Sequence, residues 1–141
     1  LDGAVEGLVD GKADYFMWEK FTTKPIVDKG VFRRVDNCPT PWPCFVIAVR
    51  DELIENNLEE LNTILDIINN TTSDFKSIPS IDKTISNRYD QKLEDVQEWL
   101  NLTEWSQENI DKSTITNVQN KLFELNIIDK KLQYPEIVYK L

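Results

Sequence analysis

The side chains of this sequence that could do chemistry are an aromatic ring and a carboxylate, next to each other at Trp18 and Glu19. They end a short apolar run, Tyr15-Phe16-Met17-Trp18, which is rich in aromatic residues and too short for a helix. We expect this run to be a buried strand. Ligands of open α/β sheets bind at the carboxyl ends of strands, so the pair predicts a ligand-binding site.

The chain contains few residues that could act in catalysis. It contains no His, which excludes Ser-His-Asp and Cys-His catalysis. General acid-base catalysis would fall to carboxylates or Lys, and no carboxylate pair stands out from the acidic background. We therefore predict a protein that is not an enzyme, with no catalytic residues and no cofactor.

The two cysteines, Cys38 and Cys44, flank a proline-rich segment. Without His, a zinc site built on them would need two carboxylate ligands, which is rare beside paired thiols, so we predict no metal site. A disulfide can close this loop in an oxidising compartment, whereas free buried thiols are the interpretation that we favour.

A helix precedes the first predicted strand. Apolar residues recur at helical spacing after Asp2, which can cap the helix, and Gly11 can end it in the left-handed conformation. A second short helix follows the strand. We expect Thr22 or Thr23 to cap it, Pro25 to lie in its first turn and Gly30 to end it.

A short strand over residues 31–35 then leads to a connector with three prolines, Pro39, Pro41 and Pro43. Alternate prolines remove backbone donors and prevent both a helix and a central strand, so this connector should be stiff and extended. It runs into residues 44–49, an apolar run that predicts another strand.

From Asp51 onward the apolar period becomes helical. We expect Asp51 to cap an amphipathic helix of about five turns that packs against the sheet. Further helices are predicted around residues 89–100 and 114–126, with Trp99 and Trp105 in the core and a docked C-terminal tail. The apolar stripe of the helix that begins at Asp51 consists of Ile54, Leu58, Leu61, Leu65 and Ile68, and it is widened by Leu53, Ile64 and Ile67.

Charge and hydropathy limit the partners of the chain. The formal net charge is -9, and no more than two Lys or Arg stand side by side, so nucleic acid is not expected as a partner. No apolar run is long enough to span a bilayer, so we expect no membrane insertion. The N-terminus has no signal-peptide pattern and begins with Leu, which suggests a fragment or processed product.

The order of these parts resembles the second half of a type 2 periplasmic-binding-protein fold. The resemblance is narrower to the nitrate, sulfonate, taurine and thiamine-pyrimidine solute-binding proteins and their cytosolic relatives. It depends on Gly11-x-Ala13-Asp14 before a strand ending in Trp18-Glu19, a crossover, and a long helix. It implies an α/β fold, the C-terminal part of a two-lobed protein, with short strands and several amphipathic helices.

The resemblance also implies a division of the chain. Residues 1–36 would be the end of the second lobe, residues 37–50 a crossover or hinge strand around Pro39, Pro41 and Pro43, and residues 51–141 helices that close the first lobe. The missing N-terminal half of the same protein would then be a partner, and the isolated chain can self-associate.

The resemblance implies that the protein binds a small molecule by closing two lobes around it. A planar amino-heterocycle such as a pyrimidine would be a suitable ligand. Trp18 would stack on the heterocycle, Glu19 would accept its hydrogen bonds, and Thr40 and Trp42 would lie on the cleft floor. Each has an ordinary alternative, since Trp18 can be core, Glu19 a solvated strand end, and Trp42 can pack on the prolines.

Two alternative functions remain open. One is an enzyme of the pyrimidine-synthase type with the same fold, although a chain without His cannot carry the histidine that such enzymes consume. The other is a helical protein-interaction module that uses the apolar stripe from Ile54 to Ile68. The cytoplasm is the expected compartment, and the periplasm or secretion is the alternative if a signal peptide was removed upstream.

Overall fold

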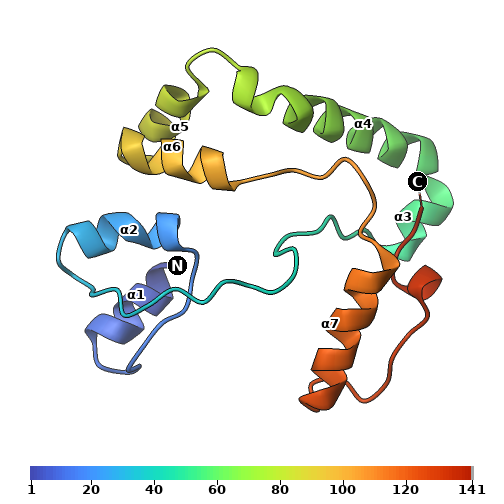
Figure 1. The fold of residues 1–141 in the computed structure, drawn as a ribbon, viewed down its shortest axis with the longest axis horizontal. Helices are drawn as coiled ribbons and strands as arrows, with labels where there is room; N and C mark the ends of the chain where they lie inside the picture. Colours follow the sequence, from blue (N-terminus) through green and yellow to red (C-terminus); the bar gives the residue numbers. More distant parts are fainter. Residues whose placement is uncertain (141) are drawn as a thin grey trace. The chain divides into compact units, whose positions relative to one another are not determined.

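The computed structural model describes residues 1–140, and its regular structure is helical (Figure 1). Helices make up 56% of the described residues, which contain no strand. The predicted α/β fold is therefore wrong. The three runs expected to be strands, residues 15–18, 31–35 and 44–49, are extended or bent and have no hydrogen-bonded ladder.

The physical reason is that a strand exists only through its neighbours. Aromatic and β-branched residues favour strands when their side chains pack on a sheet, and the same short runs have no such preference alone. Tyr15 is 76% exposed and Phe45 is 87% exposed. These apolar runs are thus uncovered segments between helices.

The chain forms two compact units. Unit 1 combines Leu1–Pro39 with Pro79–Thr103, and unit 2 combines Thr40–Ile78 with the described residues from Glu104 onward. The chain thus passes between the units three times, after Pro39, Ile78 and Thr103. Neither unit is a continuous stretch of sequence.

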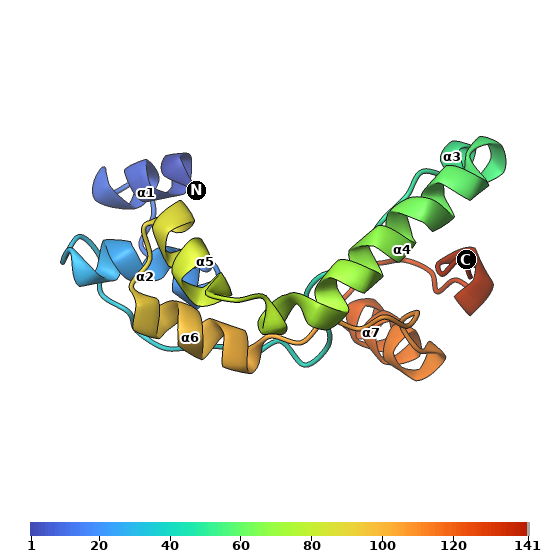
Figure 2. The ribbon, with the colours of Figure 1, turned by 90° about the horizontal axis from the view of Figure 1, so that it is seen from above.

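Unit 1 contains four helices, α1 (Asp2–Val9), α2 (Lys20–Asp28), α5 (Ile81–Tyr89) and α6 (Leu93–Leu102). Helix α6 packs against α5 and also against α2, and α5 and α6 lie side by side in both views (Figure 2). The buried hydrophobic residues within residues 1–140 are Val96 and Leu100, which are four apart on α6. This spacing places them on one face of the helix, where they form the core of unit 1.

The ends of the first two helices partly follow the sequence. Gly11 and Gly30 both have positive φ angles, +67° and +73°, as expected for residues that leave a helix. Asp2 lies in the first turn of α1 but does not cap it. Helix α2 begins earlier than predicted, because Glu19 rather than Thr22 is its N-cap.

Unit 2 contains α3 (Asp51–Asn56), α4 (Leu58–Asp74), α7 (Lys112–Glu124) and the short 3-10 helices η1 (Phe75–Ser77) and η2 (Tyr134–Glu136). The single long helix predicted from Asp51 is interrupted at Asn57, where φ is -137°. Arg50, and not Asp51, occupies its N-cap position. Helix α4 then runs on to Asp74, directly after the polar run at residues 69–73 near which the helix was expected to end.

An aromatic contact and a hydrogen bond from a side chain to the backbone hold the remaining parts of unit 2 together. Trp105 packs edge-on against Phe75, with ring centroids 5.2 Å apart, although both Trp105 and, in unit 1, Trp99 are half-buried rather than core. The hydroxyl of Tyr134 donates to the carbonyl of Ile110 at 2.6 Å. The C-terminal tail therefore docks within unit 2, as predicted.

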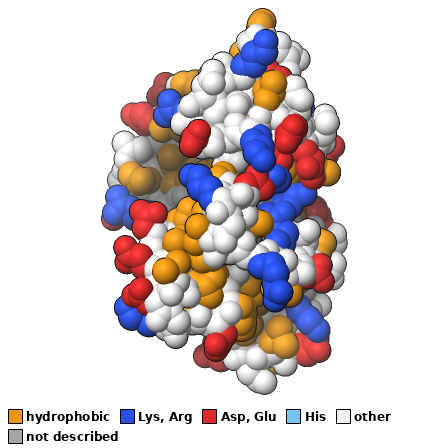
Figure 3. All heavy atoms as spheres, turned by 90° about the vertical axis from the view of Figure 1, so that its left-hand side faces the viewer, with side chains coloured by type: hydrophobic (Ala, Val, Ile, Leu, Met, Phe, Trp, Pro, Cys, Tyr) orange, Lys and Arg blue, Asp and Glu red, His pale blue; other side chains and the backbone are white. Residues whose placement is uncertain are grey.

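Much apolar surface stays in contact with solvent. The accessible surface is 11373 Å², whereas two compact domains of half this mass would expose about 9,100 Å² together. Figure 3 shows hydrophobic side chains lying open between charged ones on one face of the molecule. The uncovered apolar residues are therefore the first place to look for a binding surface.

Candidate functional site

The side chains of Trp18 and Glu19 have different environments. Trp18 is 61% exposed and stacks on Phe16, with ring centroids 6.0 Å apart and planes 19° apart. The Glu19 carboxylate accepts hydrogen bonds from the backbone amides of Phe21 and Thr22, at 3.0 and 2.7 Å. It also accepts from the Thr22 hydroxyl at 2.9 Å. Glu19 is therefore occupied in starting α2, and the ligand-binding role of both residues stays a prediction.

The connector residues lie at the junction of the units. Thr40 and Trp42 belong to unit 2, where the Thr40 hydroxyl lies 2.6 Å from the Cys44 thiol and Trp42 is half-buried. Cys38 and Cys44 are free and exposed, so the expectation of buried thiols is wrong. The segment contains no helix or strand, and its residues 37–43 are exposed except for Trp42. The hinge role of Pro39, Pro41 and Pro43 stays a prediction.

Other kinds of site are not found in the described part of the chain. No group of three or more His, Cys, Asp or Glu residues in it could hold a metal ion. None of the helices within residues 1–140 has both the length and the apolar character that crossing a membrane requires.

A row of charged pairs joins α2 to α6 in unit 1. Lys20 contacts Glu98 at 2.7 Å, and Lys24 contacts the buried Asp95 at 3.2 Å. Helix α2 supplies these lysines four residues apart, and α6 supplies the acids three apart in the reverse order. The row is therefore an antiparallel match between two helices, and each charge in it already has a partner.

Lys92 and Asp28 form the third pair of this row, and contacts within the row shift two pKa values. The ammonium of Lys92, 2.7 Å from Asp28, and then that of Lys24 hold the pKa of the Asp28 carboxyl below its ordinary value. Hydrogen bonds to Asp28 and then to Asp95 raise the pKa of Lys24. Both shifts favour the charged forms of Asp28 and Lys24, as expected where opposite charges are in contact.

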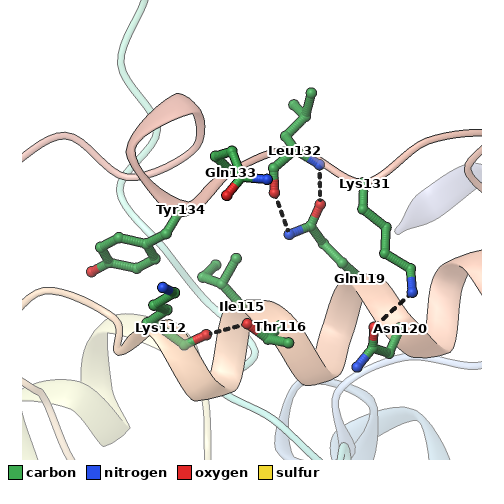
Figure 4. A pocket seen from close by; sticks show the side chains of 9 residues that line it. All are labelled: Lys112, Ile115, Thr116, Gln119, Asn120, Lys131, Leu132, Gln133 and Tyr134. Carbon is green, nitrogen blue, oxygen red and sulfur yellow. Dashed lines mark hydrogen bonds between the residues drawn. The ribbon is translucent and has the colours of Figure 1, made fainter.

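A pocket of about 190 Å³ lies between α7 and the C-terminal tail (Figure 4). The Gln119 side chain crosses it, donating to the carbonyl of Leu132 and accepting from the Leu132 amide, at 3.1 and 2.7 Å. Lys131 contacts the Asn120 side chain at 2.8 Å. The pocket is smaller than ordinary ligand sites of about 300–1,000 Å³, and its polar groups bind one another. The hydrogen bonds of Gln119 to Leu132 hold the tail against α7.

Helix α4 presents the remaining candidate. Glu60, Ile64, Ile67 and Asp74 follow one another at steps of four, three and seven residues, a spacing that places them on one face of a helix. We call these four residues the α4 outer face. Ile64 is 53% exposed and Ile67 is 60% exposed. Two large apolar side chains thus lie open between two carboxylates.

The rest of α4 explains why this face is open. Leu61 and Leu65, in the middle of the predicted stripe, are half-buried, and α4 packs against α3 and η1, its neighbours in sequence. The Thr71 hydroxyl donates to the carbonyl of Ile67 at 2.7 Å, which satisfies that hydroxyl inside the helix. The Thr71 hydroxyl therefore does not compete with an apolar contact beside Ile67.

Charge is distributed unevenly around this helix. Residues 51–75 hold seven acidic residues and no Lys or Arg, while the other 116 residues hold 18 acidic and 16 basic residues, a net charge of -2. Most of the net charge of -9 therefore lies on α3 and α4. The seven are Asp51, Glu52, Glu55, Glu59, Glu60, Asp66 and Asp74.

The apolar stripe from Ile54 to Ile68 was expected mainly to pack against a sheet, and its use by an interaction module was an alternative. Ile64 and Ile67 widen the apolar stripe, and a wide stripe suggested a sheet beneath the helix. The absence of Lys and Arg from residues 51–75 was the signal that could have identified a separate surface. A helix packed on its own domain usually carries charges of both signs on its solvent side.

Comparison of the chain with known protein families, curated proteins and solved structures gives no match.

Proposed function

We propose that this chain is a helical protein-interaction module that binds a helix of a partner protein along the α4 outer face. The observation that supports this function is the exposure of Ile64 and Ile67 on a regular 17-residue helix. Recognition of an apolar stripe by another helix is a common way in which proteins bind peptide segments.

The size of the face suits one helix. Seventeen residues extend about 25 Å at 1.5 Å per residue, so a partner helix of similar length can lie along α4. Full burial of an Ile side chain is worth roughly 1.5–3 kcal/mol, and covering each of these half-exposed residues should contribute about 1–2 kcal/mol. The two together supply a core for a moderate complex.

The function expected from the periplasmic-binding-protein resemblance has lost its structural basis, because that fold is α/β and this chain is helical. Small-molecule binding stays a prediction without a supporting pocket in the described residues. The pyrimidine-synthase alternative assumed the same α/β fold.

Fluorescence anisotropy with labelled amphipathic peptides tests the proposed function. Three 18-residue peptides share one Leu/Ile face and differ only at their polar positions, which are Lys, Gln or Glu. We expect at least one to bind the full chain. Replacing both isoleucines of the outer face, I64S/I67S, should weaken that binding roughly 30-fold or more, because the apolar contact is lost.

The matched control is Ile127→Ser, because Ile127 is also in unit 2 and is 64% exposed. It should leave the affinity unchanged, and circular dichroism should show the same helix content in all variants. No binding of any peptide, or equal losses with I64S/I67S and Ile127→Ser, would overturn the proposed function.

A further inference from the structure

We infer that the partner of the α4 outer face is a basic amphipathic helix, an inference that rests on the proposed function. The argument begins with the carboxylates beside the apolar residues. Glu60 and Asp74 end the face that holds Ile64 and Ile67, and both are exposed. A helix lying along this face must therefore bring groups that can face two carboxylates.

The carboxylates of α4 have no cation of their own. The ion pairs within residues 1–140 include Glu52 of α3, which contacts Arg50 at 2.6 Å, and none involves Glu59, Glu60, Asp66 or Asp74. Exposed charges that are left unpaired on one surface produce a field that attracts the opposite sign. Lys or Arg on the partner would complete these pairs.

A second copy of this chain is disfavoured on the same grounds. Two α4 helices packed through their outer faces would set carboxylates against carboxylates, and like charges across an interface oppose association. A neutral apolar helix would cover Ile64 and Ile67 but would leave Glu60 and Asp74 beside it without partners. Only a basic helix satisfies both parts of the face.

The same three peptides test the sign of the partner. We expect the Lys peptide to bind the full chain at least about tenfold more tightly than the Gln peptide, and the Glu peptide to bind least. The advantage of the Lys peptide should shrink between 50 and 500 mM NaCl, because salt screens exposed charges. Stopped-flow measurements should place most of that salt effect in the association rate.

A charge variant separates the contribution of the acidic residues to binding from that of the apolar residues. Glu60→Gln, Asp66→Asn and Asp74→Asn together remove three charges from the beginning, middle and end of α4, so that their effects on the helix dipole largely offset one another. Binding of the Lys peptide should weaken about tenfold, while binding of the Gln peptide should stay the same. The matched control removes three exposed charges elsewhere in unit 2, through Glu104→Gln, Glu108→Gln and Asp129→Asn, and should change neither affinity.

The outcomes separate the two proposals. Equal affinity for the Lys and Gln peptides, with both lost in I64S/I67S, overturns the basic partner and leaves the interaction module standing. A homodimer at pH 7 that I64S/I67S dissolves, detected by sedimentation velocity, also overturns the basic partner, because the face then binds its own copy. Failure of all three peptides overturns the proposed function itself.

Discussion

At the scale of single residues, polar side chains of this chain bind backbone amides at the starts of helices. Glu19 binds two amides at the start of α2, and Asp111 does the same work for α7 by accepting from the Thr114 amide at 2.9 Å. Hydrogen bonds from the Ser113 and Thr114 hydroxyls and from that amide lower the pKa of the Asp111 carboxyl. The Asp111 carboxylate is thus held in its charged form at the start of α7.

Replacement of Glu19 tests whether this role is structural. Glu19→Ala removes the acceptor for the first amides of α2 and should lower the free energy of unfolding by about 1 kcal/mol, the usual size of a lost N-cap. Glu19→Asp keeps a carboxylate at the cap and should recover most of that loss. Urea unfolding followed by circular dichroism measures both, and equal stability of wild type and Glu19→Ala would contradict the cap.

Sequence reasoning selected Glu19 as a ligand-binding residue, a role that stays a prediction, and did not identify it as the N-cap of α2. A carboxylate after an aromatic run is typical both of a strand end that faces a ligand and of a residue that begins a helix. Thr22 and Thr23 are common N-cap residues, and they hid the earlier start of α2. The choice between these positions depends on where the preceding chain runs, which is information that no local pattern contains.

At the scale of elements, α6 organises unit 1. It packs against two other helices and carries Val96, Leu100 and the acidic half of the charged row. Because the core of unit 1 has so few buried side chains, each buried apolar residue supplies a large share of the stability of the unit. Removal of one of these side chains should therefore destabilise the whole of unit 1.

Two leucines on the same helix give a matched comparison. Leu100 is 9% exposed and Leu102 is 63% exposed, so Leu100→Ala should cost about 2–4 kcal/mol and Leu102→Ala less than about 0.5 kcal/mol. Hydrogen exchange of the α6 amides, compared between the variants and wild type, measures the difference. Similar losses for both variants would mean that Leu100 does not form the core.

Helices with a regular apolar period were predictable, and strands were not. The predicted helix near residues 114–126 corresponds to α7, and the one near residues 89–100 lies mainly on α6. A helix satisfies its hydrogen bonds within its own segment, so a local pattern is enough. A strand needs a partner from elsewhere, and short apolar runs such as residues 44–49 are compatible with both a buried strand and an exposed connector.

At the scale of the whole molecule, net charge opposes the exposed apolar surface. The charge of -9 keeps separate copies apart at neutral pH, while many large hydrophobic side chains remain accessible. The two effects have different pH dependences. Apolar surface is unchanged by pH, whereas the charge approaches zero near the isoelectric point of about 4.5.

Lowering the pH should therefore cause self-association. We expect sedimentation velocity to show a monomer at pH 7 and increasing association as the pH falls toward 4.5, because repulsion between copies decreases. The I64S/I67S variant should associate less than wild type at pH 5, with Ile127→Ser as its control. Association that is strongest at pH 7 and decreases on acidification would contradict this balance of charge and apolar surface.

The three crossings between the units have a consequence for synthesis on the ribosome. Unit 1 needs α5 and α6, which follow its first 39 residues only after unit 2 has contributed Thr40–Ile78. At about 5–20 residues per second, residues 40–103 take roughly 3–13 s to be made. During that time Lys20 and Lys24 lack their contacts with Glu98 and Asp95 of α6. Helix α2 thus leaves the ribosome well before α6, the helix against which it packs.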